Sequence, residues 1–117
     1  MKSVEALWTA RFGDVSAPDK WENGGVAVFE TGRIFGGDGG TYYIGQYEIK
    51  GNKLGGKITI TRYDERYRLA FGDIPSPMVA IIEAEMTHPD LIRGHMWPES
   101  DPKNKIMFDL KRRADLP

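Results

Sequence analysis

Cysteine is absent from this 117-residue sequence. Its absence excludes disulfides, thiol nucleophiles and cysteine metal sites together. No apolar run approaches the length of a membrane-spanning helix, and residues 1–14 have no apolar core of the kind found in signal peptides. We therefore expect a cytoplasmic protein that has no membrane partner.

Neither acidic nor basic side chains are in excess. Sixteen basic and seventeen acidic side chains give a formal net charge of −1. Such a balance gives little attraction to nucleic acid, although residues 111–113 read Lys-Arg-Arg and three further arginines lie at 62, 66 and 68. We expect no nucleic-acid partner, and the length predicts a single domain over residues 1–117.

Short segments of alternating apolar and polar residues run through the chain. In residues 4–12, Val4, Ala6, Trp8, Ala10 and Phe12 share one face, which is the pattern of a half-buried strand. Turn residues separate the segments. The predicted strands are residues 4–12, 26–32, 33–38, 41–50, 57–63, 78–86, 91–97 and 105–112.

The connections between these strands are short, so neighbouring strands should run antiparallel. Eight strands in so short a chain indicate a small closed up-and-down barrel, which has no free edges. A two-sheet sandwich is the alternative. Residues 64–76 interrupt the alternation and predict a short helical or loop excursion from the barrel.

The glycine-rich stretch GGDGG, residues 36–40, raises the question of a phosphate-binding loop. Such a loop needs a following lysine and the first turn of a helix. Here β-branched and aromatic residues follow instead, whereas Asp38-Gly39 is a strong hairpin signal. The stretch therefore predicts a turn between two strands.

The same stretch belongs to a wider pattern. A GGD sequence precedes a Tyr-x-Gly strand, and a later strand closes in Arg-Tyr. This pattern resembles the GrlR family, small negative regulators of type III secretion genes, over roughly residues 7–63. The matching residues are Gly36, Gly37, Asp38, Tyr43, Gly45, Arg62 and Tyr63.

The resemblance implies a lipocalin-like eight-stranded barrel that forms a homodimer. It also implies a regulator that binds a partner protein and does not bind DNA. One hairpin departs from the family, since Lys50 and Lys53 stand where the founding member has the acidic run that binds its activator. That particular partner is therefore not expected here.

Histidines and carboxylates give little sign of a metal or catalytic site. His88 and His95 are seven residues apart, and a shared metal would need help from Glu83 and Glu85. No serine lies in a nucleophile elbow. We expect no enzyme, no metal and no cofactor; a small barrel enzyme would require Asp38, His95 or Glu83 to converge in one cavity.

The predicted strand at residues 78–86 is apolar on both faces in its first half. One face of a barrel strand points inward and the other should meet water, which predicts that a cover lies over its outside. Either residues 66–71 or a second subunit would provide it. We predict a homodimer that buries Ala80, Ile82 and Ala84, in which case Ile82→Asp would split it.

An eight-stranded barrel is either filled by side chains or holds one small molecule. Candidate lining residues are Trp8, Phe12, Phe29, Tyr43, Tyr47 and Met96. The same residues also suit an ordinary core, which is the interpretation we favour for so short a chain. The sequence thus predicts a non-enzymatic regulatory or protein-interaction barrel, with a carrier or sensor of a small apolar ligand as the alternative.

Overall fold

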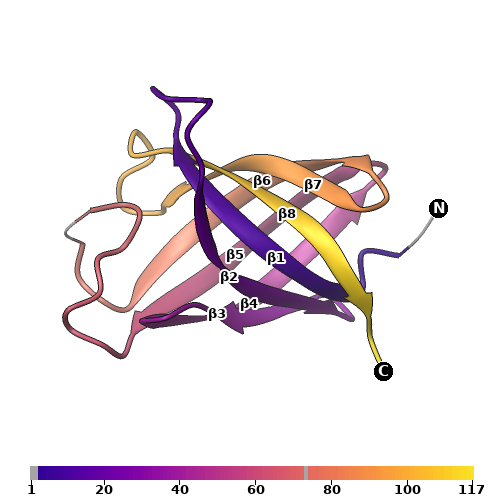
Figure 1. Cartoon of the computed structure of the whole chain (residues 1–117), viewed down its shortest axis with the longest axis horizontal. Helices are drawn as coiled ribbons and strands as arrows, with labels where there is room; N and C mark the ends of the chain where they lie inside the picture. The colour runs from indigo at the N-terminus through magenta and orange to yellow at the C-terminus, as the bar shows by residue number, and fades with distance from the viewer. Residues whose placement is uncertain (1–2, 73) are drawn as a thin grey trace.

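The structure is a computed structural model that describes residues 3–72 and 74–117. Within this part of the chain, eight antiparallel strands close into one up-and-down barrel, in which each strand pairs with the next and β8 pairs with β1 (Figure 1). The strands are β1 (Ala6–Asp14), β2 (Glu22–Glu30), β3 (Arg33–Gly37), β4 (Thr41–Lys50), β5 (Lys53–Arg62), β6 (Met78–His88), β7 (Leu91–Pro98) and β8 (Ile106–Asp115). The predicted all-β barrel is confirmed.

The alternation in β1 shows how the sequence defines the inside of the barrel. Ala6, Trp8 and Ala10 are buried, and the half-buried Phe12 packs against the core. The residues between them lie on the outer face. Small residues on the inner wall leave room for the large rings, and this inward-facing set from all eight strands forms the one core of the barrel among the described residues.

Two strands begin earlier than the sequence predicts. β2 starts at Glu22 and β5 at Lys53, so the glycine-containing segments 22–25 and 53–56 belong to the sheet and not to turns. Residues 53–56 pair in continuous register, for example Gly55 with Glu48, whereas residues 22–25 pair with β1 across a register shift between Thr9 and Arg11. The hairpins are therefore longer and their loops shorter than expected.

The excursion after β5 is a loop. Residues 64–72 and 74–76 contain turns and an isolated bridge between Leu69 and Gly72, with no helix. Leu69 and Phe71 are buried in the core, and the Asn104 side-chain amide donates to the carbonyl of Phe71 at 2.9 Å. This loop covers the end of the barrel opposite the two chain termini (Figure 1).

In the described residues, no helix is long and apolar enough to span a membrane.

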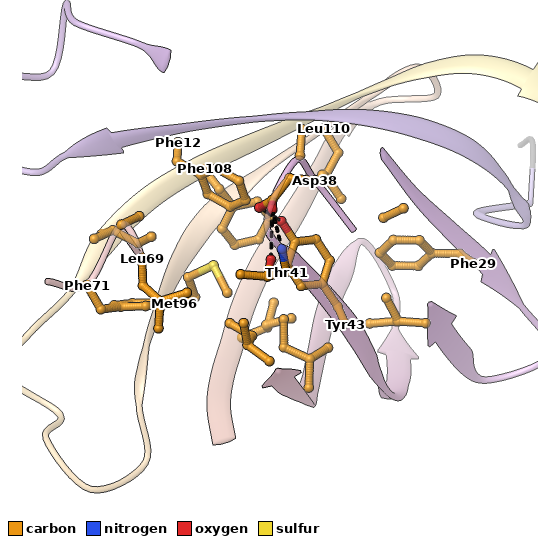
Figure 2. Close-up of a pocket in the computed structure, with 18 of the residues that line it drawn as sticks. Phe12, Phe29, Asp38, Thr41, Tyr43, Leu69, Phe71, Met96, Phe108 and Leu110 are labelled. Carbon is orange, nitrogen blue, oxygen red and sulfur yellow. Dashed lines mark hydrogen bonds between the residues drawn. The ribbon is translucent and has the colours of Figure 1, made fainter. Parts of the chain in front are cut away.

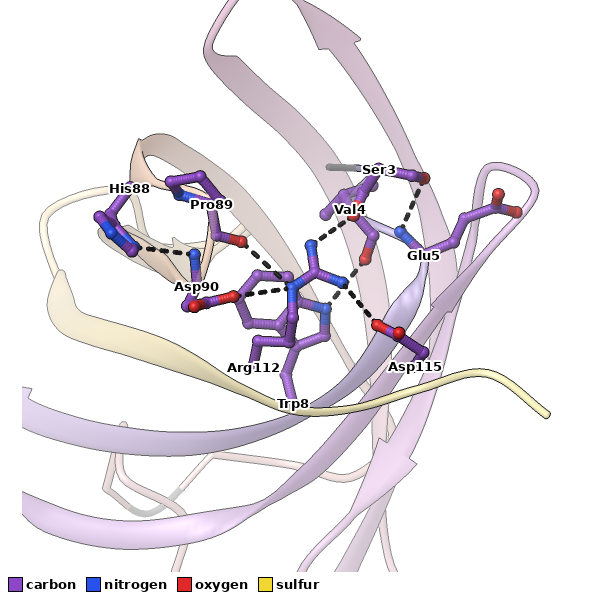
Figure 3. A network of polar contacts seen from close by, with 9 residues as sticks. All are labelled: Ser3, Val4, Glu5, Trp8, His88, Pro89, Asp90, Arg112 and Asp115. Atoms are coloured by element: carbon purple, nitrogen blue, oxygen red, sulfur yellow. Dashed lines mark hydrogen bonds and ion pairs between the residues drawn. The ribbon is translucent and has the colours of Figure 1, made fainter. Parts of the chain in front are cut away.

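The opposite end of the barrel is closed by Arg112. Its guanidinium lies 4.8 Å from the centre of the Trp8 ring, pairs with Asp90 at 3.2 Å and donates to the carbonyls of Pro89 and Ser3 (Figure 3). The Trp8 indole N–H donates to the Val4 carbonyl at 2.9 Å. The N-terminal segment, the β6–β7 turn and β8 are thereby joined over the buried indole.

The inner face of β6 is the one that carries Met78, Ala80 and Ile82, all of them buried. The prediction that Ala80, Ile82 and Ala84 form a dimer interface is therefore wrong, since these side chains point into the barrel. The register explains why: Ala80 lies opposite the inward-facing Ile58 of β5, and partners in register share a face. Ala84 packs against the same core.

Candidate functional site

The barrel interior contains a cavity of about 90 Å³. It lies toward the end covered by the loop, between the aromatic rings of β1 and β8 on one side and the β3–β4 hairpin on the other (Figure 2). Most of the lining is apolar. The lining residues are Ala10, Phe12, Ala27, Phe29, Ile34, Asp38, Thr41, Tyr43, Leu54, Ile58, Ile60, Tyr67, Leu69, Ala70, Phe71, Ile82, Met96, Ile106, Phe108 and Leu110.

One charged side chain lines this apolar cavity. Oδ1 of Asp38 accepts hydrogen bonds from the backbone N–H groups of Gly40 (3.0 Å) and Thr41 (2.9 Å), and from the Thr41 hydroxyl (2.9 Å). Its Oδ2 accepts from the Tyr43 hydroxyl at 2.5 Å. The Asp38 N–H donates in turn to the Thr41 carbonyl at 3.0 Å. Asp38 thus holds its own turn and orients a buried tyrosine (Figure 2).

The GGDGG stretch is therefore a turn that also contributes to the interior. A Cβ on Gly40 would overlap the ring of Tyr67, so glycine at this position lets the loop after β5 pack directly on the hairpin. Burial, reinforced by the Asp38 carboxylate, raises the pKa of Tyr43 well above the ordinary tyrosine range. The same two causes raise the pKa of Tyr67. The Tyr43 hydroxyl therefore stays protonated at neutral pH and donates to Asp38.

Most of the other residues of the family pattern lie around the same turn. The Tyr63 hydroxyl donates to the Asp38 carbonyl at 3.1 Å, and the Tyr63 N–H donates to the Gly40 carbonyl at 3.0 Å. The Arg62 N–H donates to the Ser76 hydroxyl at 2.9 Å. Gly36 lies opposite Tyr43 on the neighbouring strand. Most of the pattern thus forms one hairpin-and-loop cluster with a structural role, whereas Gly45 lies further along β4, opposite Ile34 and Ile58.

Four of the six candidate lining residues do line the cavity: Phe12, Phe29, Tyr43 and Met96. Trp8 does not, because it is fully buried at the Arg112 end. Tyr47 packs against Phe29, with ring centres 5.1 Å apart, but does not reach the cavity. The sequence did not predict the lining residues Tyr67, Leu69 and Phe71. Leu69 and Phe71 are two residues apart within the predicted excursion, and this apolar alternation could have indicated that they are buried.

Glu83, His95 and Asp38 do not converge. Glu83 and His95 are cross-strand partners with exposed side chains on the outside of β6 and β7, whereas Asp38 lines the interior. The site considered for a small barrel enzyme is therefore not formed. His88 lies at the end of β6, where its Nδ1 accepts from the Asp90 N–H at 3.1 Å. Residues 3–72 and 74–117 contain no group of three or more metal-ligating side chains.

A second polar cluster lies on the outer face of β1, β7 and β8. Asp109 is 3% exposed, and its carboxylate accepts from Arg11 at 2.9 and 2.5 Å and lies 3.5 Å from Arg93. Trp21 packs on the Arg11 guanidinium at 4.5 Å from the ring centre. Burial tends to raise the pKa of Asp109, but the hydrogen bond and charge of Arg11, with help from Arg93, outweigh it and hold that pKa below its ordinary value.

The outer side of β2, β3 and β4 is apolar and exposed. Val28 lies beside Phe35, and Phe35 beside Ile44, so these side chains form one row across three strands. Phe35 is 40% and Ile44 60% exposed. A second row contains Val26 and Tyr42, on either side of Gly37. We call these five side chains, Val26, Val28, Phe35, Tyr42 and Ile44, the apolar outer face.

The residues around the apolar outer face are mostly uncharged. Its rows continue on β1 into Leu7 and Thr9, and on β5 into Thr59 and Thr61. At its borders, Glu30 and Arg33 pair with each other at one end, and Arg113 donates to the Thr9 hydroxyl beside Val26. An exposed contiguous apolar surface of this kind is typical of a contact site. The sequence analysis did not select these residues, because their alternation was used only to identify the inner face.

No protein-family model matches this sequence, and no curated protein matches it either.

Proposed function

We propose that this protein is a non-enzymatic, cytoplasmic regulatory barrel that acts by binding a partner protein and assembles as a homodimer through the apolar outer face. The row of Val28, Phe35 and Ile44 carries the proposal, because it exposes large apolar side chains that water solvates poorly. The pattern around Asp38, which resembles the GrlR family, favours the same class of function. The cysteine-free sequence favours the cytoplasm.

A second copy of this chain is the occupant that the apolar outer face fits best. In a two-fold dimer the same patch meets itself, so a patch with an excess of one charge would repel its own copy. Neither row of the apolar outer face contains a charged residue. The aromatic ring of Phe35 stands at the centre of its row, between Val28 and Ile44, where the residues that dominate binding energy are usually found.

Sedimentation velocity over a range of protein concentrations tests this assembly. The wild-type protein should sediment as a dimer at micromolar concentration. Phe35→Lys should weaken the dimer by at least ~30-fold, because it places a charge in the centre of the apolar face. Ile81→Lys, on the outer face of β6 and outside both rows, is the matched control and should sediment as the wild type does. A monomeric wild type, or equal effects of the two substitutions, would contradict the proposal.

The alternative function, a carrier or sensor of a small apolar ligand, is favoured by the apolar lining of the cavity. Its volume of about 90 Å³ is too small for a lipid chain while Leu69 and Phe71 occupy the end of the barrel. Native mass spectrometry distinguishes the two functions. A dimer without added mass supports the protein-binding function, whereas a persistent adduct of a few hundred daltons would favour the carrier.

A further inference from the structure

The interior combines a cavity with a carboxylate that has no cationic partner. Asp38 receives hydrogen bonds from Gly40, Thr41 and Tyr43, and all of these donors are neutral. Among residues 3–72 and 74–117, no lysine, arginine or histidine forms an ion pair with it. Asp38 is half-buried, whereas Asp109, the buried carboxylate described above, has two arginines. The two carboxylates therefore differ in whether the chain itself supplies the counter-charge.

The surroundings of Asp38 favour one kind of cation as its binding partner. A metal ion requires several oxygen ligands and keeps waters around it, whereas the cavity walls are almost entirely apolar. An organic ammonium requires one carboxylate, benefits from aromatic faces and has an apolar remainder to bury. Tyr43 and Tyr67 line the same cavity as Asp38, and the Tyr43 hydroxyl donates to the Asp38 carboxylate.

The volume limits the size of the ligand. A cavity of about 150 Å³ holds benzene, which has six heavy atoms, so the 90 Å³ cavity accepts about four. Four heavy atoms correspond to a primary ammonium group on a three-carbon chain. The exposed residue Ala70 is among the lining residues, so the cavity ends close to the surface beside the loop.

We propose that the barrel interior is a binding site for a small alkylammonium ion, with its charge on the Asp38 carboxylate and its alkyl chain among the apolar lining. The ammonium donates to Oδ2 of Asp38, which accepts from the Tyr43 hydroxyl, since Oδ1 already accepts three hydrogen bonds. The chain lies toward Phe108 and Met96. This site is inside the barrel and does not depend on the apolar outer face.

The test is a titration of the ¹⁵N-labelled protein with propylammonium, followed by amide chemical shifts. Saturable shifts are expected for the backbone around Asp38 and for Phe108, with a dissociation constant roughly in the millimolar range, which four heavy atoms can supply. 1-Propanol and propionate are the matched probes. The former has the same heavy-atom count without charge and the latter has the opposite charge, so both should bind at least tenfold more weakly.

Two variants locate the site. Asp38→Asn retains an Oδ1 acceptor for the turn and removes the charge, so it should weaken propylammonium binding at least tenfold. Ala10→Leu fills the cavity without touching the carboxylate, so it should abolish binding and keeps the test decisive if Asp38→Asn does not fold. Equal binding of 1-propanol and propylammonium, unchanged affinity in Asp38→Asn, or no saturable shift with propylammonium would each overturn the proposal.

Discussion

At the scale of single residues, Asp38 decides how the β3–β4 hairpin and the interior fit together. Its side chain replaces the water that the turn N–H groups of Gly40 and Thr41 would otherwise bind, and it also holds the buried Tyr43 hydroxyl. In the GGDGG stretch, Gly36 and Gly40 leave room for the neighbouring strand and the Tyr67 ring, whereas the aspartate supplies the hydrogen bonds. The sequence predicted the turn correctly, but hairpin chemistry alone did not reveal that the same carboxylate enters the core.

Asp38→Ala should lower the free energy of unfolding by about 2–3 kcal/mol, because it leaves turn N–H groups and the buried Tyr43 hydroxyl without their acceptor. Tyr43→Phe removes only one of these bonds and should cost about 1 kcal/mol. Urea denaturation monitored by tryptophan fluorescence gives both values. If the two variants lost equal stability, the turn bonds of Asp38 would contribute nothing measurable.

The Asp109 cluster predicts a pH dependence of stability. The pKa of Asp109 lies below its ordinary value of 3.8 in the folded state. The folded protein therefore binds this proton less tightly than the unfolded chain does. The resulting stabilisation is complete above the unfolded-state pKa and is lost as the pH falls through the folded-state pKa. Acid should therefore weaken the barrel below about pH 4.

Asp109→Asn isolates this contribution. Near neutral pH the substitution should cost about 1–2 kcal/mol, less than for a fully buried pair, because the Arg11 and Arg93 side chains are 42% and 56% exposed. The difference from the wild type should shrink at about pH 3, below the ordinary pKa of an aspartate, because the unfolded chain then takes up a proton at this position. Urea unfolding at both pH values measures it. A difference that stays constant with pH would show that the carboxylate charge is not responsible.

At the scale of elements, β6 illustrates what alternation can and cannot predict. Its first half is apolar on both faces, so a period of two identifies a strand without saying which face is inside. The register with β5 settles it, since the inward-facing Ile60 and Ile58 lie opposite Met78 and Ala80. In β1, by contrast, polar residues alternate with apolar ones, and the predicted inner face was right.

Ile82→Asp should therefore unfold the barrel without specifically splitting a dimer. It places a carboxylate in the core and should cost roughly 3 kcal/mol or more. Ile81→Asp makes the same chemical change one residue away on the outer face and should cost about 1 kcal/mol. Thermal unfolding of both variants compares them directly. Similar losses would mean that the two faces of β6 are not distinguished by burial.

The early start of β2 has a different cause. Glycine, asparagine and proline in residues 16–25 indicated a turn, yet residues 22–25 are strand. A Cβ on Gly24 would overlap the ring of Phe12, so glycine here makes room on the inner wall and does not mark a turn. A single sequence gives the residue type but not the neighbouring ring that requires it.

At the scale of the whole molecule, the barrel has two different ends and an asymmetric outside. Arg112 and Trp8 fill one end, and Leu69 and Phe71 fill the other, which leaves a small cavity between them. The sequence predicted the fold class and two thirds of the candidate lining residues because both follow from alternation. It did not predict the apolar outer face, because that surface exists only where three strands bring their outward side chains into adjacent rows.

The measurement that tests the proposed assembly most directly is an intermolecular NOE experiment on a mixture of ¹³C-labelled and unlabelled protein. We expect contacts between chains from the Ile44 methyl groups to the Phe35 or Tyr42 rings, because a two-fold dimer places the apolar outer face against itself. Intermolecular contacts from the outer face of β6, such as Ile81, with none from Ile44, would contradict the account. So would the absence of any intermolecular contact at concentrations well above micromolar.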